Sequence, residues 1–310
     1  MKALVTGGAG FIGSNLVKAL INQGDNVVVI DNLLSGYKKN LAAIPEVDFI
    51  EGDIRDSDLL NKIMNEVEVV YHLAASVGNK RSIEHPFLDA DINVMGTLNI
   101  LEIARQHKVK KIIISSSAGV FGELKLLPIK EDHPIEPRTP YASSKLYAEK
   151  VSLSYADLYD MDVVCLRYFN VYGPHQRFDA YGNVIPIFTF KLLRGETLSV
   201  YGDGEQTRDF VNVNDIVQAN IKAAKTDGLT GVFNIASGTQ ITINQLIGEL
   251  ITVSEISPAI KYKNPRPGDV RDSLADINAA QRAFNYSPYV NLQAGLREYV
   301  NWAKSELNTD

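Results

Sequence analysis

A glycine-rich segment near the N-terminus constrains the fold of this chain more than any other feature. Residues 6–14 have the sequence TGGAGFIGS, with glycines at positions 7, 10 and 13. The apolar run at residues 3–5 predicts a buried strand, and apolar residues at three- and four-residue spacing from Phe11 to Ile21 predict a helix. A tight glycine turn that leads into a helix N-terminus presents backbone N–H groups to a pyrophosphate. The segment therefore predicts a dinucleotide-binding fold rather than an ordinary turn.

The second predicted strand, Asn26–Ile30, is followed by Asp31. A carboxylate at that place accepts hydrogen bonds from the ribose hydroxyls of NAD, and it repels the additional phosphate of NADP. No lysine follows Gly13, so the segment lacks the signature of a nucleoside triphosphate P-loop. We therefore expect NAD as the cofactor.

Strand and helix patterns alternate through the first half of the chain. Further strands are predicted at residues 48–50, 68–73, 110–114 and 163–167, and helices at residues 56–65, about 87–106 and from Tyr141 onward. Such alternation is typical of an α/β fold with a doubly wound parallel (Rossmann) sheet, whose ligands bind beyond the carboxyl ends of the strands.

The pattern changes after residue 170, where glycine and proline become frequent. Helical patterns remain at residues 213–224, 243–253 and 292–307, and residues 209–211 and 232–235 are expected to return to the sheet. We expect two domains: an NAD-binding domain of residues 1–170 with about 208–237, and a smaller mixed α/β substrate domain of about 171–207 and 238–310.

The composition narrows the class of partner. The net charge is −6 with both signs interspersed, which argues against nucleic-acid and membrane-surface partners. Cys165 is the only cysteine and lies in an apolar run, which predicts a buried thiol, and the five histidines lack the spacing of metal ligands. Met1 and Lys2 lead directly into the first strand, and no apolar run approaches the ~18 residues that span a bilayer. We expect a cytoplasmic protein without a metal or a disulfide.

Tyr141 and Lys145 are four residues apart at the start of a predicted helix, so their side chains share one face. A tyrosine that acts as a general base needs its phenolate stabilised from an ordinary pKa near ~10, and a lysine cation within a few ångströms does this. Ser117, at the end of a predicted strand, is placed to hydrogen-bond a sugar hydroxyl, although a serine run also caps turns. These three residues are the candidate catalytic group.

The whole chain resembles the extended short-chain dehydrogenases/reductases, and among them the UDP-sugar 4-epimerases. Besides the glycine segment and the pair Asp31 and Asn32, the motifs that carry the resemblance are residues 52–54 (GDI), 72–75 (HLAA), 93–97 (NVMGT), 115–122 (SSSAGVFG), 140–145 (PYASSK), 167–174 (RYFNVYGP), 207–211 (TRDFV) and 265–269 (PRPGD).

The resemblance implies a role for each matching residue. It implies that NAD is held by Gly7, Gly10, Phe11, Ile12, Gly13, Asp31, Asn32, Asp53, Ile54, Leu73, Ala74, Ala75, Asn93, Tyr141, Lys145 and Phe169. It implies that the UDP-sugar is held by Ser117, Tyr141, Asn170, Asn183, Val184, Tyr201, Arg208, Arg266, Asp269 and Ser273. Among these, the arginines suit the bidentate binding of phosphate, and Tyr201 is the candidate to stack on uracil.

The resemblance also bears on the reaction. Family members that dehydrate or decarboxylate carry an acid directly after the catalytic hydroxyl residue, whereas Ala118 follows Ser117 here. This difference favours an NAD-dependent 4-epimerase that oxidises C4 transiently to a 4-keto sugar. A net nucleotide-sugar reductase or dehydratase and a non-catalytic NAD-sensing scaffold are the alternatives.

Two further expectations concern the sugar and the assembly. Ser273, four residues after Asp269, matches a position that borders the hexose, and a small residue there leaves room for a substituent at C2. We therefore expect interconversion of UDP-N-acetylglucosamine and UDP-N-acetylgalactosamine alongside the UDP-glucose and UDP-galactose pair. The helices from about Phe87 and from Tyr141 carry more apolar residues than one buried face needs, which predicts a homodimer, as in similar epimerases.

Overall fold

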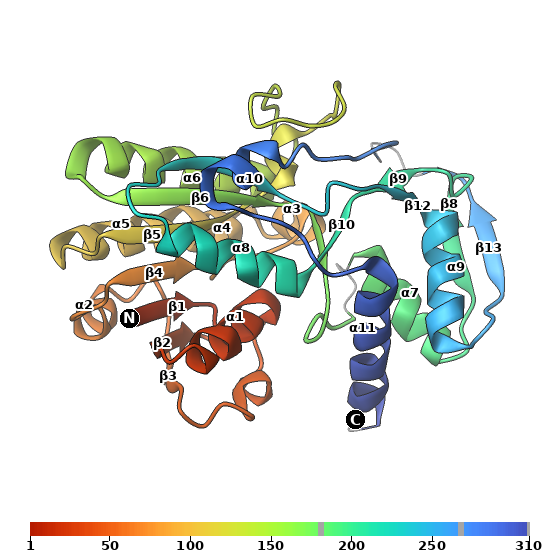
Figure 1. Ribbon diagram of the computed structural model, residues 1–310, viewed down its shortest axis with the longest axis horizontal. Helices are drawn as coiled ribbons and strands as arrows, with labels where there is room; N and C mark the ends of the chain where they lie inside the picture. The colour runs from red at the N-terminus through yellow and green to blue at the C-terminus, as the bar shows by residue number, and fades with distance from the viewer. Residues whose placement is uncertain (179–182, 266–269, 309–310) are drawn as a thin grey trace.

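A seven-stranded parallel sheet forms the centre of the computed structural model, which describes residues 1–178, 183–265 and 270–308 (Figure 1). The strand order is β11-β6-β5-β4-β1-β2-β3, and every neighbouring pair is parallel. The strands are β1 (Lys2–Thr6), β2 (Asn26–Asp31), β3 (Asp48–Glu51), β4 (Val69–His72), β5 (Lys111–Ser117), β6 (Asp162–Tyr168) and β11 (Gly231–Ile235). The order reverses next to β1, which confirms the predicted doubly wound sheet.

Alternate side chains of each strand enter the cores on opposite faces of this sheet. In β1, Ala3 and Val5 pack on one side and Leu4 on the other, and all three are fully buried. The first face is covered by α1 (Phe11–Asn22), α8 (Val213–Lys225) and α10 (Asn278–Phe284). The second face is covered by α2 (Ser57–Ile63), α5 (Thr97–Gln106) and α6 (Pro140–Tyr159). Cys165 lies buried in the second core, as predicted.

The long helix predicted near residues 87–106 is a chain of three segments. It comprises α4 (Pro86–Ala90), the π-helical segment η2 (Asp91–Gly96) and α5, and a short helix α3 (Asn79–Glu84) precedes it. Two 3-10 segments, η1 (Lys38–Leu41) and η3 (Ala118–Phe121), follow β2 and β5. Single π-helical turns inside helices occur frequently at functional sites.

A third hydrophobic cluster holds together what we call the C-terminal lobe. It consists of α7 (Val184–Leu193), β8 (Leu198–Tyr201), α9 (Ile243–Ser254), β13 (Ile260–Lys263) and α11 (Leu292–Leu307). Strand β13 pairs with β8 in parallel, and β12 (Ile241–Thr242) pairs with β9 (Thr207–Arg208) antiparallel. Figure 1 shows this lobe beside the carboxyl edge of the large sheet.

The two segments expected to return to the large sheet behave differently. Residues 232–235 do so within β11, which pairs with β6. The expectation for residues 209–211 is wrong, because β10 (Phe210–Asn212) pairs instead with β7 (Asn170–Tyr172) in a separate two-stranded sheet. The reason is that β11 already pairs with the outer edge of β6. Strand β10 pairs instead with β7, which continues the chain just after β6.

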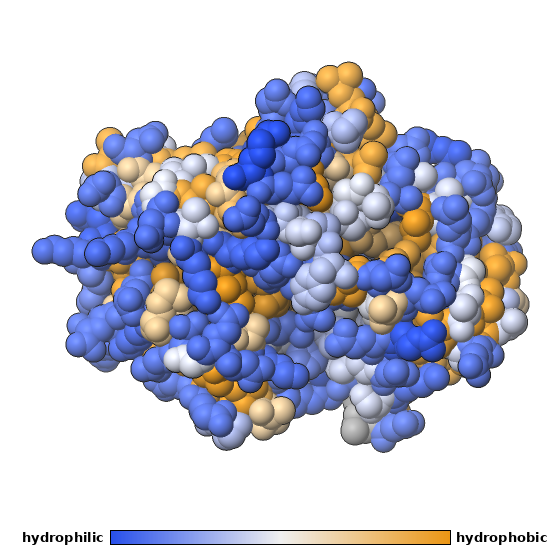
Figure 2. Space-filling view, viewed as in Figure 1, coloured by the Kyte–Doolittle hydropathy of each residue, from blue (hydrophilic) through white to orange (hydrophobic). Residues whose placement is uncertain are grey.

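A loop between η3 and α6 projects beyond the body of the molecule. Figure 2 shows hydrophobic side chains at its tip. Leu126, which belongs to this loop, is 67% exposed. Most of the remaining surface in that view is hydrophilic. Among the described residues, no helix is long and apolar enough to cross a bilayer.

Candidate active site

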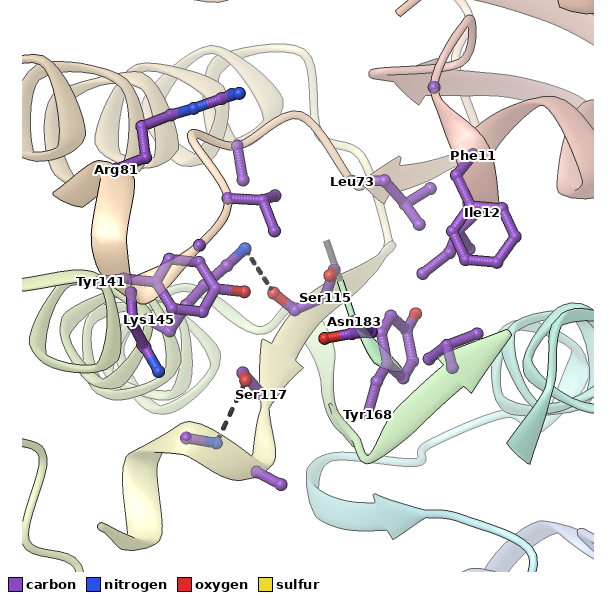
Figure 3. A pocket seen from close by; sticks show the side chains of 18 of the residues that line it. Phe11, Ile12, Leu73, Arg81, Ser115, Ser117, Tyr141, Lys145, Tyr168 and Asn183 are labelled. Carbon is purple, nitrogen blue, oxygen red and sulfur yellow. Dashed lines mark hydrogen bonds between the residues drawn. The ribbon is translucent and has the colours of Figure 1, made fainter. Parts of the chain in front are cut away.

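A cleft of about 1670 Å³ lies where the carboxyl ends of the parallel strands face the C-terminal lobe. Its walls include the glycine turn after β1, the end of β2, the segment after β4, the end of β5, the first turn of α6 and the segments around β7 and β9. Figure 3 shows that its lining side chains converge from several of these elements. Ligands of open α/β sheets bind at this edge.

The glycine turn after β1 is built for close approach to a ligand. Gly7 has φ +69°, and a Cβ there would lie 2.7 Å from the backbone nitrogen of Ala74. A Cβ on Gly13 would lie only 2.2 Å from the carbonyl oxygen of Gly7, so α1 can pack against the turn only with glycine at that position. Gly10 precedes α1 without a side-chain cap, which leaves the first N–H groups of the helix directed at the cleft.

Asp31 lies at the end of β2 in the wall of the same cleft. Its carboxylate accepts hydrogen bonds from the backbone N–H of Leu33 at 2.8 Å and of Ala9 at 3.0 Å. Burial raises the pKa of Asp31, and these two hydrogen bonds oppose the rise. The carboxylate therefore has a fixed orientation and free lone pairs for further donors.

Asp53 forms a second anchored acid along the same side of the cleft. Its carboxylate accepts from Asn32 Nδ2 at 2.8 Å and from Arg55 Nη2 at 2.7 Å. The hydrogen bond from Arg55 holds the pKa of Asp53 well below its usual range. Arg55 also pairs with Asp91 at the start of η2, which joins this wall to the π-helical segment.

Ser117, Tyr141 and Lys145 meet at the carboxyl end of β5 (Figure 3). Thr139 caps α6 by accepting from the Ala142 N–H at 3.2 Å, and this starts the helix where Tyr141 and Lys145 share one face. Lys145 Nζ donates to the Ser115 carbonyl at 2.9 Å, and Ser117 Oγ accepts from the Gly119 N–H at 3.1 Å. The sequence-predicted trio is thus assembled in one place.

The electrostatics of this trio differ from the sequence expectation. Desolvation raises the pKa of Tyr141 to about 12, whereas we expected the lysine to lower it, and the hydrogen bond with Ser117 opposes the rise. Desolvation lowers the pKa of Lys145 to about 8, and the negative charge of Asp89 opposes that fall. The closed surroundings therefore favour the neutral form of both groups.

Most of the other predicted site residues line the cleft as well. Those that do are Gly7, Gly10, Phe11, Ile12, Gly13, Asp31, Asn32, Asp53, Ile54, Leu73, Ala74, Ala75, Phe169, Asn170, Asn183, Arg208 and Ser273. Arg208 Nη1 donates a hydrogen bond to the Thr207 carbonyl at 2.7 Å, and this contact orients the guanidinium.

Three predicted residues have other places, and two lie outside the part of the chain that the structure describes. Asn93 is buried behind the cleft wall, where its amide bonds the backbone of Ser76. Val184 packs against the hydrophobic cluster of the C-terminal lobe, and Tyr201 ends β8 with Lys263 Nζ 5.6 Å from its ring centroid. Arg266 and Asp269 lie outside the described residues.

Several residues that line the cleft were not predicted from the sequence, and two of them contact each other. Tyr37 and Arg177 both line the cleft, and the Arg177 guanidinium lies on the Tyr37 ring. Tyr37 precedes η1 and Arg177 follows β7, so only the folded chain brings them together. Neither residue lies in one of the sequence motifs named above, so the sequence did not indicate their contact.

Comparisons with known proteins place the chain in a family. The model of the GDP-mannose 4,6 dehydratase family matches residues 4–299. The crystal structure of UDP-glucose 4-epimerase from Thermotoga maritima, with UDP-glucose, is 40% identical, covers 99% of this chain and all of its own, and superposes with a TM-score of 0.94. The chain is an extended short-chain dehydrogenase/reductase of the UDP-sugar 4-epimerase family.

Two other solved members of the family are similar over their whole length. UDP-N-acetylglucosamine 4-epimerase from Methanobrevibacter ruminantium, in complex with UDP-N-acetylmuramic acid, is 39% identical with a TM-score of 0.94, and 98% of each chain is covered. UDP-glucose 4-epimerase from Thermus thermophilus, in complex with NAD, is 35% identical with a TM-score of 0.87, and 98% of this chain and 99% of that chain are covered. The resemblance inferred from the motifs is thereby confirmed.

Proposed function

We propose that this protein is an NAD-dependent 4-epimerase of UDP-sugars. The observation that carries the proposal is the juxtaposition, in one cleft, of the uncapped glycine turn with Asp31 and of Ser117, Tyr141 and Lys145. The first set fits a dinucleotide diphosphate and its ribose, and the second fits proton transfer at a sugar hydroxyl. The similar structure with NAD supports the cofactor site, and the similar structure with UDP-glucose supports the sugar site.

The residues have separate roles in the proposed reaction. When bound, NAD supplies the hydride acceptor and donor that a 4-epimerisation through a 4-keto sugar needs. The Tyr141 oxygen takes the proton of the C4 hydroxyl during oxidation and returns it when the carbonyl is reduced on its other face. Ser117 holds the C4 oxygen by a hydrogen bond. The Lys145 ammonium and the cationic oxidised nicotinamide favour the phenolate against the desolvation that opposes it.

We further propose how the two halves of the fold share the ligands. The sheet and its helices, residues 1–170 with about 208–237, form the NAD-binding domain, and residues of about 171–207 and 238–310 form the nucleotide-sugar domain. Asn170 and Arg208 in the cleft are assigned to the diphosphate of the UDP-sugar. A place in the cytoplasm stays a prediction from the sequence.

We propose that the enzyme acts on two pairs of UDP-sugars. One pair is UDP-glucose and UDP-galactose, and the other carries an N-acetyl group at C2. Ser273 lines the cleft with a small, buried side chain, so a tyrosine at this position would add bulk to this wall of the cleft. The UDP-N-acetylglucosamine 4-epimerase among the similar structures supports this specificity. Overpacking costs about 1–3 kcal/mol, so Ser273→Tyr is expected to lower activity on N-acetylated substrates about 5- to 150-fold while activity on UDP-glucose survives. Equal losses on both substrates would refute this assignment.

A panel of UDP-sugars tests the activity itself. Incubation followed by analysis of the released sugar is expected to show conversion between the C4 epimers of at least one pair. Tyr141→Phe is expected to lower kcat by about 10²- to 10⁴-fold with UDP binding retained. Absence of any C4 conversion over the panel, or full activity in Tyr141→Phe, would overturn the proposed function.

We also propose that the protein is a homodimer. Large apolar side chains remain exposed along α4, η2 and α6. Phe87 is 90% exposed, and the others are Leu88, Met95, Tyr147, Leu158 and Tyr159. These three segments contact one another, and exposed apolar side chains gathered on neighbouring elements mark interaction sites. Helices that present such a face on one copy can pack against the same helices of a second copy around a twofold axis.

A further inference from the structure

A buried acid lies behind the catalytic trio. Asp89 of α4 is 1% exposed, although an ionised carboxylate is costly to bury without partners. Asn93 Nδ2 lies 3.1 Å from Asp89 Oδ1 and 3.1 Å from Ser144 Oγ. Ser144 directly precedes Lys145 in α6, so the acid is tied to the helix that carries the catalytic pair.

The same cluster reaches the segment that follows β4. Asn93 Oδ1 accepts from the Ser76 N–H at 2.8 Å, and Asn93 Nδ2 donates to the Ser76 carbonyl at 3.0 Å. The neighbouring residues Ala75 and Val77 line the cleft. Asn93 sits within η2, so the π-helical segment presents this side chain to both walls. Asp89, Asn93, Ser144 and Ser76 form what we call the acid node.

The charge of the acid node acts on both catalytic groups. Burial raises the pKa of Asp89, and the hydrogen bond with Ser144, the attraction of Lys145 and the hydrogen bond with Asn93 oppose that rise. In return, the carboxylate opposes the fall in the pKa of Lys145, and it adds to the rise in the pKa of Tyr141.

Asp89 is the carboxylate whose charge acts on both Tyr141 and Lys145. On the β4 side, His72 is the titratable neighbour of Lys145, and burial keeps it neutral by lowering its pKa to about 3. The β5 neighbour of Lys145 is the uncharged Ser115 carbonyl. Glu149, one turn after Lys145 in α6, is buried and bonded to Arg167. The acids nearest to Asp89 in sequence, Glu84 of α3 and Asp91 of η2, are exposed and pair with Lys80 and Arg55.

We propose that Asp89 is a positioning residue that helps to keep Lys145 protonated beside Tyr141, through its charge and through the acid node. The proposal rests on the proposed epimerase function for the roles of Tyr141 and Lys145. Because burial alone disfavours the ammonium, the carboxylate is what preserves a cation beside the base over the working pH range.

Replacing the carboxylate by an amide separates charge from shape. Asp89→Asn keeps the size of the side chain and a carbonyl oxygen for Asn93, but it removes the negative charge. Without this charge, Lys145 loses its proton at lower pH, and the Tyr141 phenol ionises at lower pH. The alkaline limb of the kcat–pH profile is therefore expected to move to lower pH, and each unit of that shift lowers kcat on the limb about tenfold.

The ionisation of Tyr141 gives a readout that needs no turnover. Its titration is measured as the ultraviolet difference between a protein and the same protein with Tyr141→Phe, in the wild-type and the Asp89→Asn backgrounds. The expected result is a titration at lower pH in the Asp89→Asn background, in the same direction as the kcat limb. Asp58→Asn, which neutralises an exposed acid in the first turn of α2, serves as the matched control and is expected to leave both readouts unchanged.

The outcomes separate the proposal from a purely structural role. A folded Asp89→Asn or Asp89→Ser protein with a lower kcat but unshifted profiles would overturn it, and so would failure of both variants to fold. A charged Asp89→Glu variant is expected to restore the wild-type position of both curves. If the wild-type protein epimerised no UDP-sugar, the proposed function would fail, while the Tyr141 titration would still decide the influence of Asp89.

Discussion

The guanidinium carbon of Arg177 lies 3.8 Å from the centroid of the Tyr37 ring, at the edge of the cofactor half of the cleft. Arg177 Nη2 lies 2.8 Å from Glu306 of α11, and Lys39 of η1 reaches the same carboxylate at 3.2 Å. The Tyr37 N–H donates to the Ala9 carbonyl in the glycine turn. The stacked pair therefore joins the proposed cofactor site to the C-terminal lobe.

Loss of this contact is expected to speed the release of NAD. Arg177→Ala removes a cation–π contact and a partly exposed ion pair, together worth about 1–2 kcal/mol, which corresponds to about 5- to 30-fold faster dissociation. The rate is measured by displacing bound NAD and following the protein fluorescence. Arg194→Ala removes an arginine that lies over Phe178 and Phe190, and it is expected to leave the release rate unchanged. An unchanged rate in Arg177→Ala would show that the contact does not retain the cofactor.

His72 is expected to make the protein less stable in acid. It is buried between two threonines, with Thr6 Oγ1 2.8 Å from Nδ1 and Thr97 Oγ1 3.0 Å from Nε2. Thr97 donates its own proton to the Asn93 carbonyl, so it accepts from Nε2–H and the neutral ring is satisfied. Burial lowers the pKa of His72 to about 3.

The unfolded chain therefore binds a proton at His72 below pH ~6.5 that the folded chain does not. Stability is complete above that pH and is lost as the pH falls, by about 2 kcal/mol at pH 5. Urea unfolding of the wild type and of His72→Asn between pH 7.5 and 5 measures the difference. An equally steep pH dependence in both proteins would contradict the assignment.

The buried pair Glu149 and Arg167 is expected to behave as one unit in stability. Two hydrogen bonds join them, Nη2 to Oε1 at 2.6 Å and Nε to Oε2 at 3.0 Å, and both side chains are almost fully buried. Removal of one partner leaves the other charge unpaired, so Glu149→Gln and Arg167→Met each are expected to cost about 3–5 kcal/mol. The double variant Glu149→Leu with Arg167→Met is expected to lose much less than the sum in urea unfolding. Strict additivity would show that the two charges are independent.

Phe87 is expected to control the proposed dimer. Light scattering is expected to give twice the 34.2 kDa mass of the chain, and Phe87→Glu is expected to give the monomer mass because it buries a charge in an apolar interface. Leu126→Glu, at the exposed loop tip, makes the same kind of change elsewhere and is expected to leave the mass unchanged. A wild-type monomer at micromolar concentration would refute the dimer.

Local sequence patterns were sufficient for the sheet and much of the candidate site. The glycine turn, Asp31 and the spacing of Tyr141 and Lys145 depend on residues close together in the chain, where backbone conformation and side-chain periodicity decide the geometry. The position of Ser117 followed from the rule that ligands meet the carboxyl ends of parallel strands.

By itself, then, the sequence determined the doubly wound sheet, the dinucleotide turn and the catalytic trio. Only the tertiary structure decided that β11 rather than β10 extends the sheet, that Arg177 lies on Tyr37, and that Asn93 links Asp89 to Ser144. These contacts join segments that are distant in sequence and carry no shared periodicity. Two effects select these contacts: the burial of side chains, and the competition of strands and polar groups for partners. Both effects arise only when the chain packs.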